Sequence, residues 1–162
     1  TRDEAKREHR ESEGDPQLKG QIRSRQREAA RRRMLSAVPS ADIVVVNPTH
    51  YAVAIRYDEA AGGAPRVVAK GLDELAMRIQ AIARESGVPV LSAPPLARAL
   101  YAHVELDQEI PQALYVAVAQ VLVYVYQLKR WIPGRSTAPQ APVDLPVPTE
   151  MDPKHSEKGK HA

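Results

Sequence analysis

Apolar positions and proline starts predict helices in four stretches of the chain. The clearest stretch covers residues 72–86, where leucine, isoleucine and alanine keep the helical period and acidic residues fill the first turn. Further helices are predicted at residues 17–37, after an Asp-Pro start, and at residues 94–101, after a Pro-Pro pair. Residues 112–129 form the fourth. Their β-branched, partly alternating sequence also suits a strand, but the length favours a helix.

Short β-branched segments predict strands at residues 42–46, 51–57, 66–70 and 88–93. Glycine or proline punctuates the chain close to several of them. The order of elements is helix, β-β, β-α-β, helix, helix. This order predicts a small α/β domain in which about four helices cover a four-stranded mixed sheet.

The two ends of the chain differ in character from this domain. Residues 1–14 are almost wholly polar and are interpreted as a connector, followed by a long basic linker helix at 15–39. The globular part is expected at 40–131. Beyond it, six of the fourteen prolines lie among few large apolar residues, so a disordered tail is predicted for 132–162.

Composition limits the chemistry that the chain can carry. The 162 residues include 43% hydrophobic side chains but no cysteine and no phenylalanine, so the core must be aliphatic. Disulfides, thiolate metal sites and cysteine nucleophiles are excluded. The five histidines are scattered, so neither a metal site nor a cofactor is expected. No run is apolar enough to span a bilayer. The chain starts without methionine, which suggests a fragment whose missing part lies upstream.

Positive charge is concentrated in one segment. Seven lysines and arginines lie within residues 19–33 beside one acidic residue, whereas charges nearly cancel over residues 42–130. The globular part is therefore not expected to bind nucleic acid. No aromatic residue interleaves with the basic cluster, so a solvated helix face, or a connector against acidic headgroups or an acidic partner, is favoured over base recognition.

The single asparagine, Asn47, precedes Pro48 at the end of an apolar run. Ordinary deamidation is blocked there because proline has no N–H to attack the side-chain amide. The reverse attack stays open: the amide nitrogen of Asn47 can attack its own carbonyl, form a succinimide and expel Pro48. The predicted result is a cut chain.

The neighbours of this pair favour the reaction. His50 can reach back across a tight turn to transfer a proton, and Thr49 can fix the turn by local hydrogen bonding. Two alternatives stay open from the residues alone. His50 can serve only as a brace by bonding to backbone, and an Asn-Pro pair is often only a structural turn.

Signals for multiple-turnover catalysis are lacking. Glu105, Asp107 and Glu109 precede Pro111, and we interpret them as acidic residues at a helix N-terminus. The sequence has neither a Ser-His-Asp signature nor the glycine pattern of a phosphate loop. The chain is not expected to be an enzyme beyond a single self-cleavage.

Residues 44–58, VVVNPTHYAVAIRYD, resemble the cytoplasmic domain of the type III secretion export-switch family, which includes flagellar FlhB and injectisome YscU and SpaS. The resemblance extends from about Gly14 to Trp131, and two blocks favour the flagellar branch. Four further blocks resemble the family: GDPQLKGQIR (14–23), APRVVAKGLDELAMRI (64–79), GVPVLSAPPLARALY (87–101) and QEIPQALYVAVAQVLVYVYQLKR (108–130).

The resemblance implies that the full-length protein resides in the bacterial inner membrane and that this portion is cytoplasmic. It implies autocleavage between Asn47 and Pro48, with Thr49 and His50 completing the loop, and a change of export specificity from rod and hook-type to filament-type subunits. Implied partners are export apparatus proteins and those substrates. Cleavage would leave fragments of 47 and 115 residues, which are expected to stay associated through one core.

A binding surface is also suggested. The last helix is apolar around most of its circumference, so Ala119 and Leu122 are candidates for an exposed patch, with Ala64 and Pro65 alongside. Burial against the sheet is the alternative interpretation. For the whole chain, the alternative to an export switch is a scaffold or anionic-membrane-surface module in which the Asn47-Pro48 turn is only structural.

Overall fold

The computed structural model describes residues 1–154, without the side chains of residues 8–13. The chain divides into two units, Thr1–Met34 and a larger one that begins at Leu35. The first unit consists of helix α1 (Arg2–Glu13) and most of helix α2 (Pro16–Ala37). Residues 16–33 are exposed all along α2, as befits an arginine-rich helix with no continuous apolar face.

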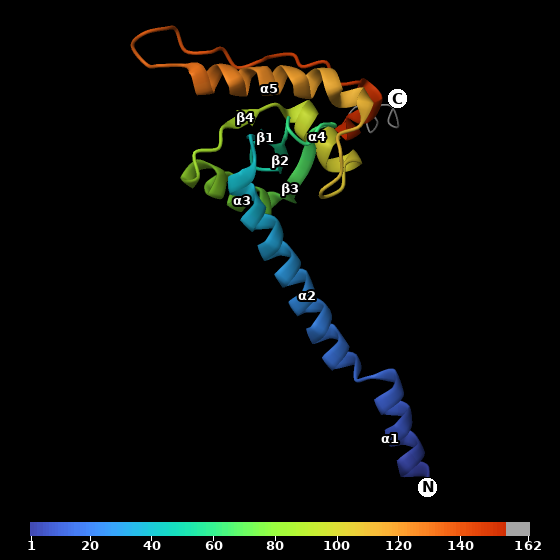
Figure 1. Cartoon of the computed structure of the whole chain (residues 1–162). Helices are drawn as coiled ribbons and strands as arrows, with labels where there is room; N and C mark the ends of the chain where they lie inside the picture. The colour runs from blue at the N-terminus through green and yellow to red at the C-terminus, as the bar shows by residue number, and fades with distance from the viewer. Residues whose placement is uncertain (155–162) are drawn as a thin grey trace. The chain divides into compact units, whose positions relative to one another are not determined.

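Four strands form one mixed sheet in the described part of the second unit (Figure 1). They are β1 (Ile43–Asn47), β2 (Tyr51–Arg56), β3 (Arg66–Leu72) and β4 (Val90–Ser92). Their order is β3-β2-β1-β4. β1 runs antiparallel to β2 and parallel to β4, and β2 runs antiparallel to β3. The predicted strands and the mixed sheet are confirmed.

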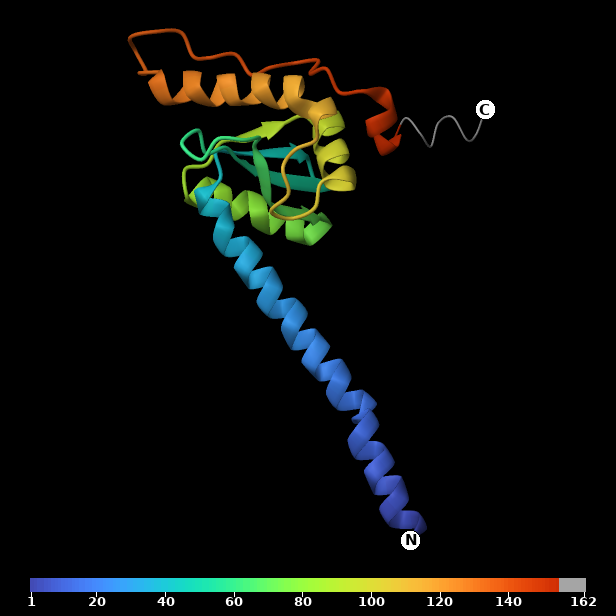
Figure 2. The ribbon, with the colours of Figure 1, turned by 45° about the vertical axis from the view of Figure 1, so that its right-hand side comes forward.

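Helices cover both faces of this sheet (Figure 2). Helix α3 (Asp73–Glu85) packs on one face, together with the short 3-10 turn at Val38–Ser40. Helices α4 (Pro94–His103) and α5 (Tyr115–Arg130) supply the apolar side chains on the other. Residues 112–129, whose sequence also suited a strand, are helical: a 3-10 turn at Gln112–Leu114 leads into α5.

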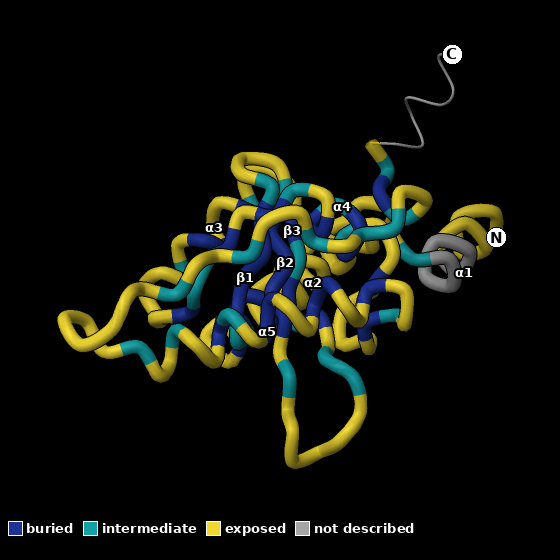
Figure 3. Tube along the Cα trace, turned by 90° about the horizontal axis from the view of Figure 1, so that it is seen from above, coloured by how far each residue is buried: buried dark blue, intermediate teal, exposed yellow. Residues whose placement is uncertain are grey.

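β1 is buried on both faces because its sequence, IVVV, has no polar alternation. Figure 3 shows this burial concentrated at the sheet and at the inner sides of the helices. The core on the α4 and α5 side is aliphatic, as composition predicts. Its fully buried side chains include Ile43, Val45, Val53, Ile55, Leu96, Leu100 and Leu114.

The acidic segment before α5 lies along the open edge of β3. Val67 donates its N–H to the Gln108 carbonyl at 3.1 Å, and Asp107 donates to the Val67 carbonyl at 2.7 Å. Arg66 bonds to the Glu109 carboxylate at 3.2 Å. The first turn of α5 contains no acidic residue, so placing this cluster at a helix N-terminus was wrong. The segment instead covers a strand edge, which would otherwise expose unpaired backbone groups.

The segment after α5 differs from the prediction of a disordered tail. From the end of α5 it returns along the outer side of that helix toward α4 (Figure 1 and Figure 2). Leu145, Val147 and Met151 pack against the core, and Asp152 is only 2% exposed. A few apolar anchors and one ion pair hold a proline-rich stretch that lacks regular structure until a 3-10 turn at Thr149–Met151. Residues 155–162 of the predicted tail lie outside the described residues.

Candidate functional site

The hairpin of β1 and β2 carries the Asn-Pro pair in its loop. Asn47 and Tyr51 are the last paired residues, so Pro48, Thr49 and His50 make the connection. The His50 backbone N–H donates a 3.0 Å hydrogen bond to the Asn47 carbonyl oxygen. Proline at the second turn position and a φ of 71° at Thr49 in the third match a type II turn. The structure therefore brings all four predicted residues together in one tight turn.

Thr49 holds a backbone conformation that its side chain disfavours. Its φ of 71° lies in the left-handed region, where glycine is the usual residue at this turn position. For an L residue the left-handed conformation costs roughly 1–2 kcal/mol, and a β-branched residue there is a genuine outlier. This strain lies one residue from the Asn47-Pro48 bond, so the intact turn stores energy beside that bond.

The start of α3 anchors the far side of the turn. The Asp73 backbone N–H donates a 2.9 Å hydrogen bond to the His50 carbonyl. The Asp73 carboxylate lies 3.8 Å from His50 Nδ1, with the two side chains 80% and 66% exposed. Such an exposed pair is strongly screened by solvent. The contact therefore adds little to holding the His50 ring, and both interpretations of His50, as a brace and as a proton carrier, stay predictions.

The geometry polarises the carbonyl that the cleavage chemistry would attack. The His50 N–H already points at the Asn47 carbonyl oxygen, where negative charge would develop in a tetrahedral intermediate. Asn47 is half-buried, and the three residues after it are exposed, so water reaches the loop. The hairpin thus combines a hydrogen-bonded Asn47 carbonyl, the strained backbone of Thr49 and a loop that water can reach.

A pocket of about 490 Å³ opens beside this loop, lined by Asn47 and His50 and by residues from α4 and the tail. Arg98 of α4 makes a two-point contact with Asp152: Nε lies 2.8 Å from Oδ1 and the second guanidinium nitrogen lies 2.9 Å from Oδ2. This hydrogen bond raises the pKa of Arg98 against the opposing effect of burial. Sequence reasoning missed both residues. The apolar residues Leu145 and Val147, two positions apart in a polar tail, were the available signal.

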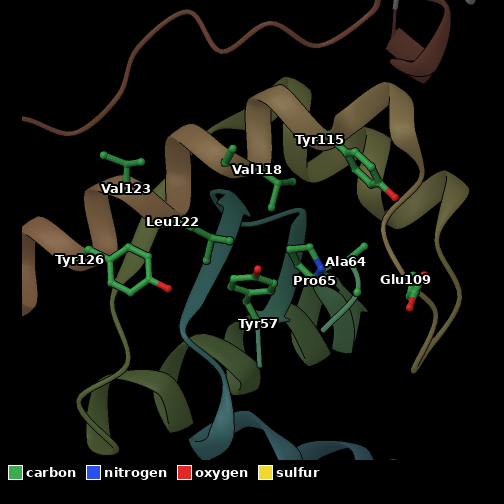
Figure 4. A pocket seen from close by; sticks show the side chains of 11 residues that line it. Tyr57, Ala64, Pro65, Glu109, Tyr115, Val118, Leu122, Val123 and Tyr126 are labelled. Atoms are coloured by element: carbon green, nitrogen blue, oxygen red, sulfur yellow. The ribbon is translucent and has the colours of Figure 1, made fainter. Parts of the chain in front are cut away.

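The four predicted patch residues lie together around a second cavity. Ala64, Pro65, Ala119 and Leu122 line a groove of about 510 Å³ between α5 and the β2–β3 loop (Figure 4). Ala119 is exposed, whereas Leu122 is 8% exposed and belongs to the core as well. Burial against the sheet, the alternative interpretation, therefore holds in large part for Leu122. Tyr115, Val123 and Tyr126 complete much of the apolar wall.

Tyr126 closes one end of this groove. Its hydroxyl donates a hydrogen bond to the Glu59 carboxylate of the β2–β3 loop. That bond to a charged acceptor is the main cause that raises the pKa of Tyr126 to about 12. Among residues with described side chains, no group of three or more His, Asp and Glu lies together to hold a metal ion. No helix within residues 1–154 is both long and apolar enough to cross a membrane.

The four-stranded mixed sheet with helices on both faces makes this a small α/β domain, and the solved cytoplasmic domain of a flagellar protein shares its fold. The sequence profile of the FlhB HrpN YscU SpaS family matches residues 1–125. The chain belongs to this family, which confirms the resemblance drawn from the sequence.

Individual relatives agree with this placement. The chain is 55% identical over 152 residues to flagellar biosynthetic protein FlhB of Escherichia coli strain K12, covering 94% of this chain and 40% of that relative. The chain thus spans less than half the length of that protein. The solved cytoplasmic domain of FlhB from Shewanella putrefaciens is 48% identical with a TM-score of 0.71, covering 77% of this chain and 97% of that one.

A more distant likeness concerns EscU. A mutated C-terminal domain of EscU, with an asparagine changed to alanine, is 28% identical with a TM-score of 0.55 and covers 57% of this chain and 92% of that one. A second EscU variant carries alanine in place of the next residue, a proline. The sheet and helices of this chain therefore recur in flagellar and EscU-type members of the family.

Proposed function

We propose that this chain is the export-switch part of a flagellar type III protein-export component, and that it cuts itself once between Asn47 and Pro48. The hydrogen bond from the His50 N–H to the Asn47 carbonyl carries the proposal, since it polarises the one carbonyl that must be attacked. Family membership supports it.

The reaction balances with the residues of the turn and water. The Asn47 side-chain nitrogen bonds to the Asn47 carbonyl carbon, and negative charge collects on the oxygen that accepts from His50. The bond to the Pro48 nitrogen then breaks, and a proton from the attacking amide passes, through water or the exposed His50 ring, to that nitrogen. A succinimide ends the first fragment until water opens the ring, and Pro48 begins the second fragment as a secondary amine.

The cut leaves a domain that stays assembled. β1, the only strand of the first fragment, is hydrogen-bonded to β2 on one side and to β4 on the other. Its valines and isoleucine are buried on both faces, and that burial outweighs the loss of one covalent link. The local consequence is release of the strained turn, which frees residues 48–50 to reshape the surface beside α3 and α4.

This rearranged surface changes which subunits the export apparatus accepts, from rod and hook-type to filament-type. The groove of Ala64, Pro65, Ala119 and Leu122 binds an apolar segment of the rod and hook-type substrates. The full-length protein resides in the bacterial inner membrane, with this portion on the cytoplasmic side among other export apparatus proteins.

Mass spectrometry of the purified protein tests the self-cleavage. We expect the intact 17.9 kDa species to convert at neutral pH into fragments of 47 and 115 residues. Asn47→Ala should abolish the conversion with the fold intact. Pro48→Ala restores an N–H after the asparagine, so deamidation should compete with cutting. A wild-type chain that stays intact would leave the turn with only a structural role.

The groove is tested in the full-length protein. Ala119→Glu places a charge on its exposed wall and should reduce export of rod and hook-type subunits. Gln120→Glu is the matched control, because Gln120 is also exposed on α5 but does not line the groove. Equal export by the two variants would remove the groove from substrate binding.

A further inference from the structure

The tail after α5 is attached to α4 at points that have no part in the cleavage chemistry. Arg98 and Asp152 form the strongest, with side chains 13% and 2% exposed. His103 Nε2 lies 3.0 Å from the Met151 carbonyl oxygen, a second link one residue away. Leu145 and Val147 add apolar contact with the core. The attachment therefore combines a buried ion pair, a hydrogen bond and aliphatic packing.

The ion pair of Arg98 and Asp152 is largely buried, although the proline-rich segment around Asp152 is mostly exposed. Taking both charges out of water is unfavourable unless the geometry is good and the remaining atoms are bonded. Asp152 meets this condition, since it also accepts the Lys154 backbone N–H at 3.1 Å. The ion pair fixes the tail at one place on α4, because a carboxylate one residue away would not reach the guanidinium in this two-point arrangement.

That place lies beside the cleavage loop. Pro153 and Lys154, directly after Asp152, line the same pocket as Asn47, and Arg98 lines it from α4. α4 itself packs on β1 and β2, with its inner leucines fully buried against them. The tail therefore secures the helix that covers the end of β1.

We propose that the docked tail, residues 145–154, is a clasp that controls how long the two cleavage fragments stay together. The inference rests on the proposed self-cleavage. Once the Asn47-Pro48 bond is cut, β1 is held only by its strand partners and by the helices that cover it. Release of the first fragment then requires α4 to move, and the clasp opposes that movement. A partner that detaches the tail from α4 would thereby promote separation of the fragments.

Fragment exchange in the cut protein tests the clasp. Unlabelled and isotope-labelled cut proteins are mixed, and native mass spectrometry follows the appearance of complexes with one fragment from each source. Asp152→Ala leaves the buried Arg98 without its carboxylate and should speed exchange roughly tenfold or more. Glu150→Ala is the matched control, since it removes an equal charge from an exposed site in the same tail. It should exchange at the wild-type rate.

A second pair of variants uses packing in place of charge. Leu145→Ala removes a contact with the core and should also speed exchange, whereas Val143→Ala, at a side chain 80% exposed, should not. Equal rates for Asp152→Ala and Glu150→Ala in cut protein overturn the clasp and leave self-cleavage standing. An intact mass that never converts overturns both, because no separable fragment then exists.

Discussion

Gly71 lies near the end of β3 where the strand faces α3, and the space there is too small for a side chain. A Cβ atom at Gly71 would lie 2.7 Å from Leu75 Cγ and 3.1 Å from Ile79 Cδ1. Carbon atoms in contact prefer roughly 3.5–4.0 Å. Leu75 is half-buried and can give way in part, whereas Ile79 is fully buried. Gly71→Ala should therefore push α3 away from the sheet.

The net effect on stability follows from two opposing contributions. Overpacking costs about 1–3 kcal/mol, while replacing glycine by alanine in a strand returns about 0.5–1 kcal/mol, since Gly71 does not need a positive φ. We expect a destabilisation of about 1–2 kcal/mol and a Tm lower by roughly 3–8 °C.

The assay is thermal and urea unfolding followed by circular dichroism, in the Asn47→Ala background so that one chain unfolds. Gly20→Ala is the control: apart from its own helix backbone, nothing lies within 4 Å of the added Cβ, so the domain transition should not move. Leu75→Ala added to Gly71→Ala should cost less than the sum of the single changes, because the clash is then removed. A stable Gly71→Ala variant, or strict additivity, would refute the reasoning.

Three further outcomes are expected. The hydrogen bond to Glu59 is the main cause that raises the pKa of Tyr126 from 10.0 to about 12. The protonated hydroxyl should therefore stabilise the fold fully below about pH 10, and this contribution should be lost as the pH rises through about 12. Tyrosinate absorbance should lose a late component in Tyr126→Phe and keep the delay of Tyr101, whose pKa is raised chiefly by burial. Asp73→Gly should stabilise the fold by about 1 kcal/mol in urea unfolding, since φ there is 47°. Thr49→Gly releases a similar strain and should slow self-cleavage up to about tenfold by mass spectrometry; an unchanged rate would separate strain from cleavage.

The elements and the reactive pair could be read from local sequence. Periods, caps and prolines act over a few residues, so the four strands and helices α2 to α5 were predicted within a few residues of their bounds, whereas the polar residues that form α1 were interpreted only as a connector. The Asn47-Pro48 chemistry depends on bonds within two adjacent residues. The left-handed φ of Thr49 was not foreseen, because a threonine in that position contradicts local preference and is imposed by the hairpin.

Contacts between distant segments were less accessible. The acidic cluster before α5 was assigned to a helix end, yet it covers the edge of β3. The unpaired backbone groups of a strand edge can bond to any segment that offers a backbone donor and acceptor, whatever its side chains. The tail was predicted to be disordered from its composition. Composition averages over many residues, whereas one buried carboxylate and a few aliphatic side chains are enough to dock a segment.

The sequence by itself determined the aliphatic core, the order of the elements, the family and the position of the Asn47-Pro48 pair that we propose is cut, because each depends on residue type or on neighbours along the chain. Tertiary structure alone decided that the start of α3 closes the hairpin, where the Asp73 N–H meets the His50 carbonyl. It also decided that Arg98 and Asp152, 54 residues apart, meet beside that hairpin. Such pairings depend on how strands and helices pack in space, a property that no local pattern contains.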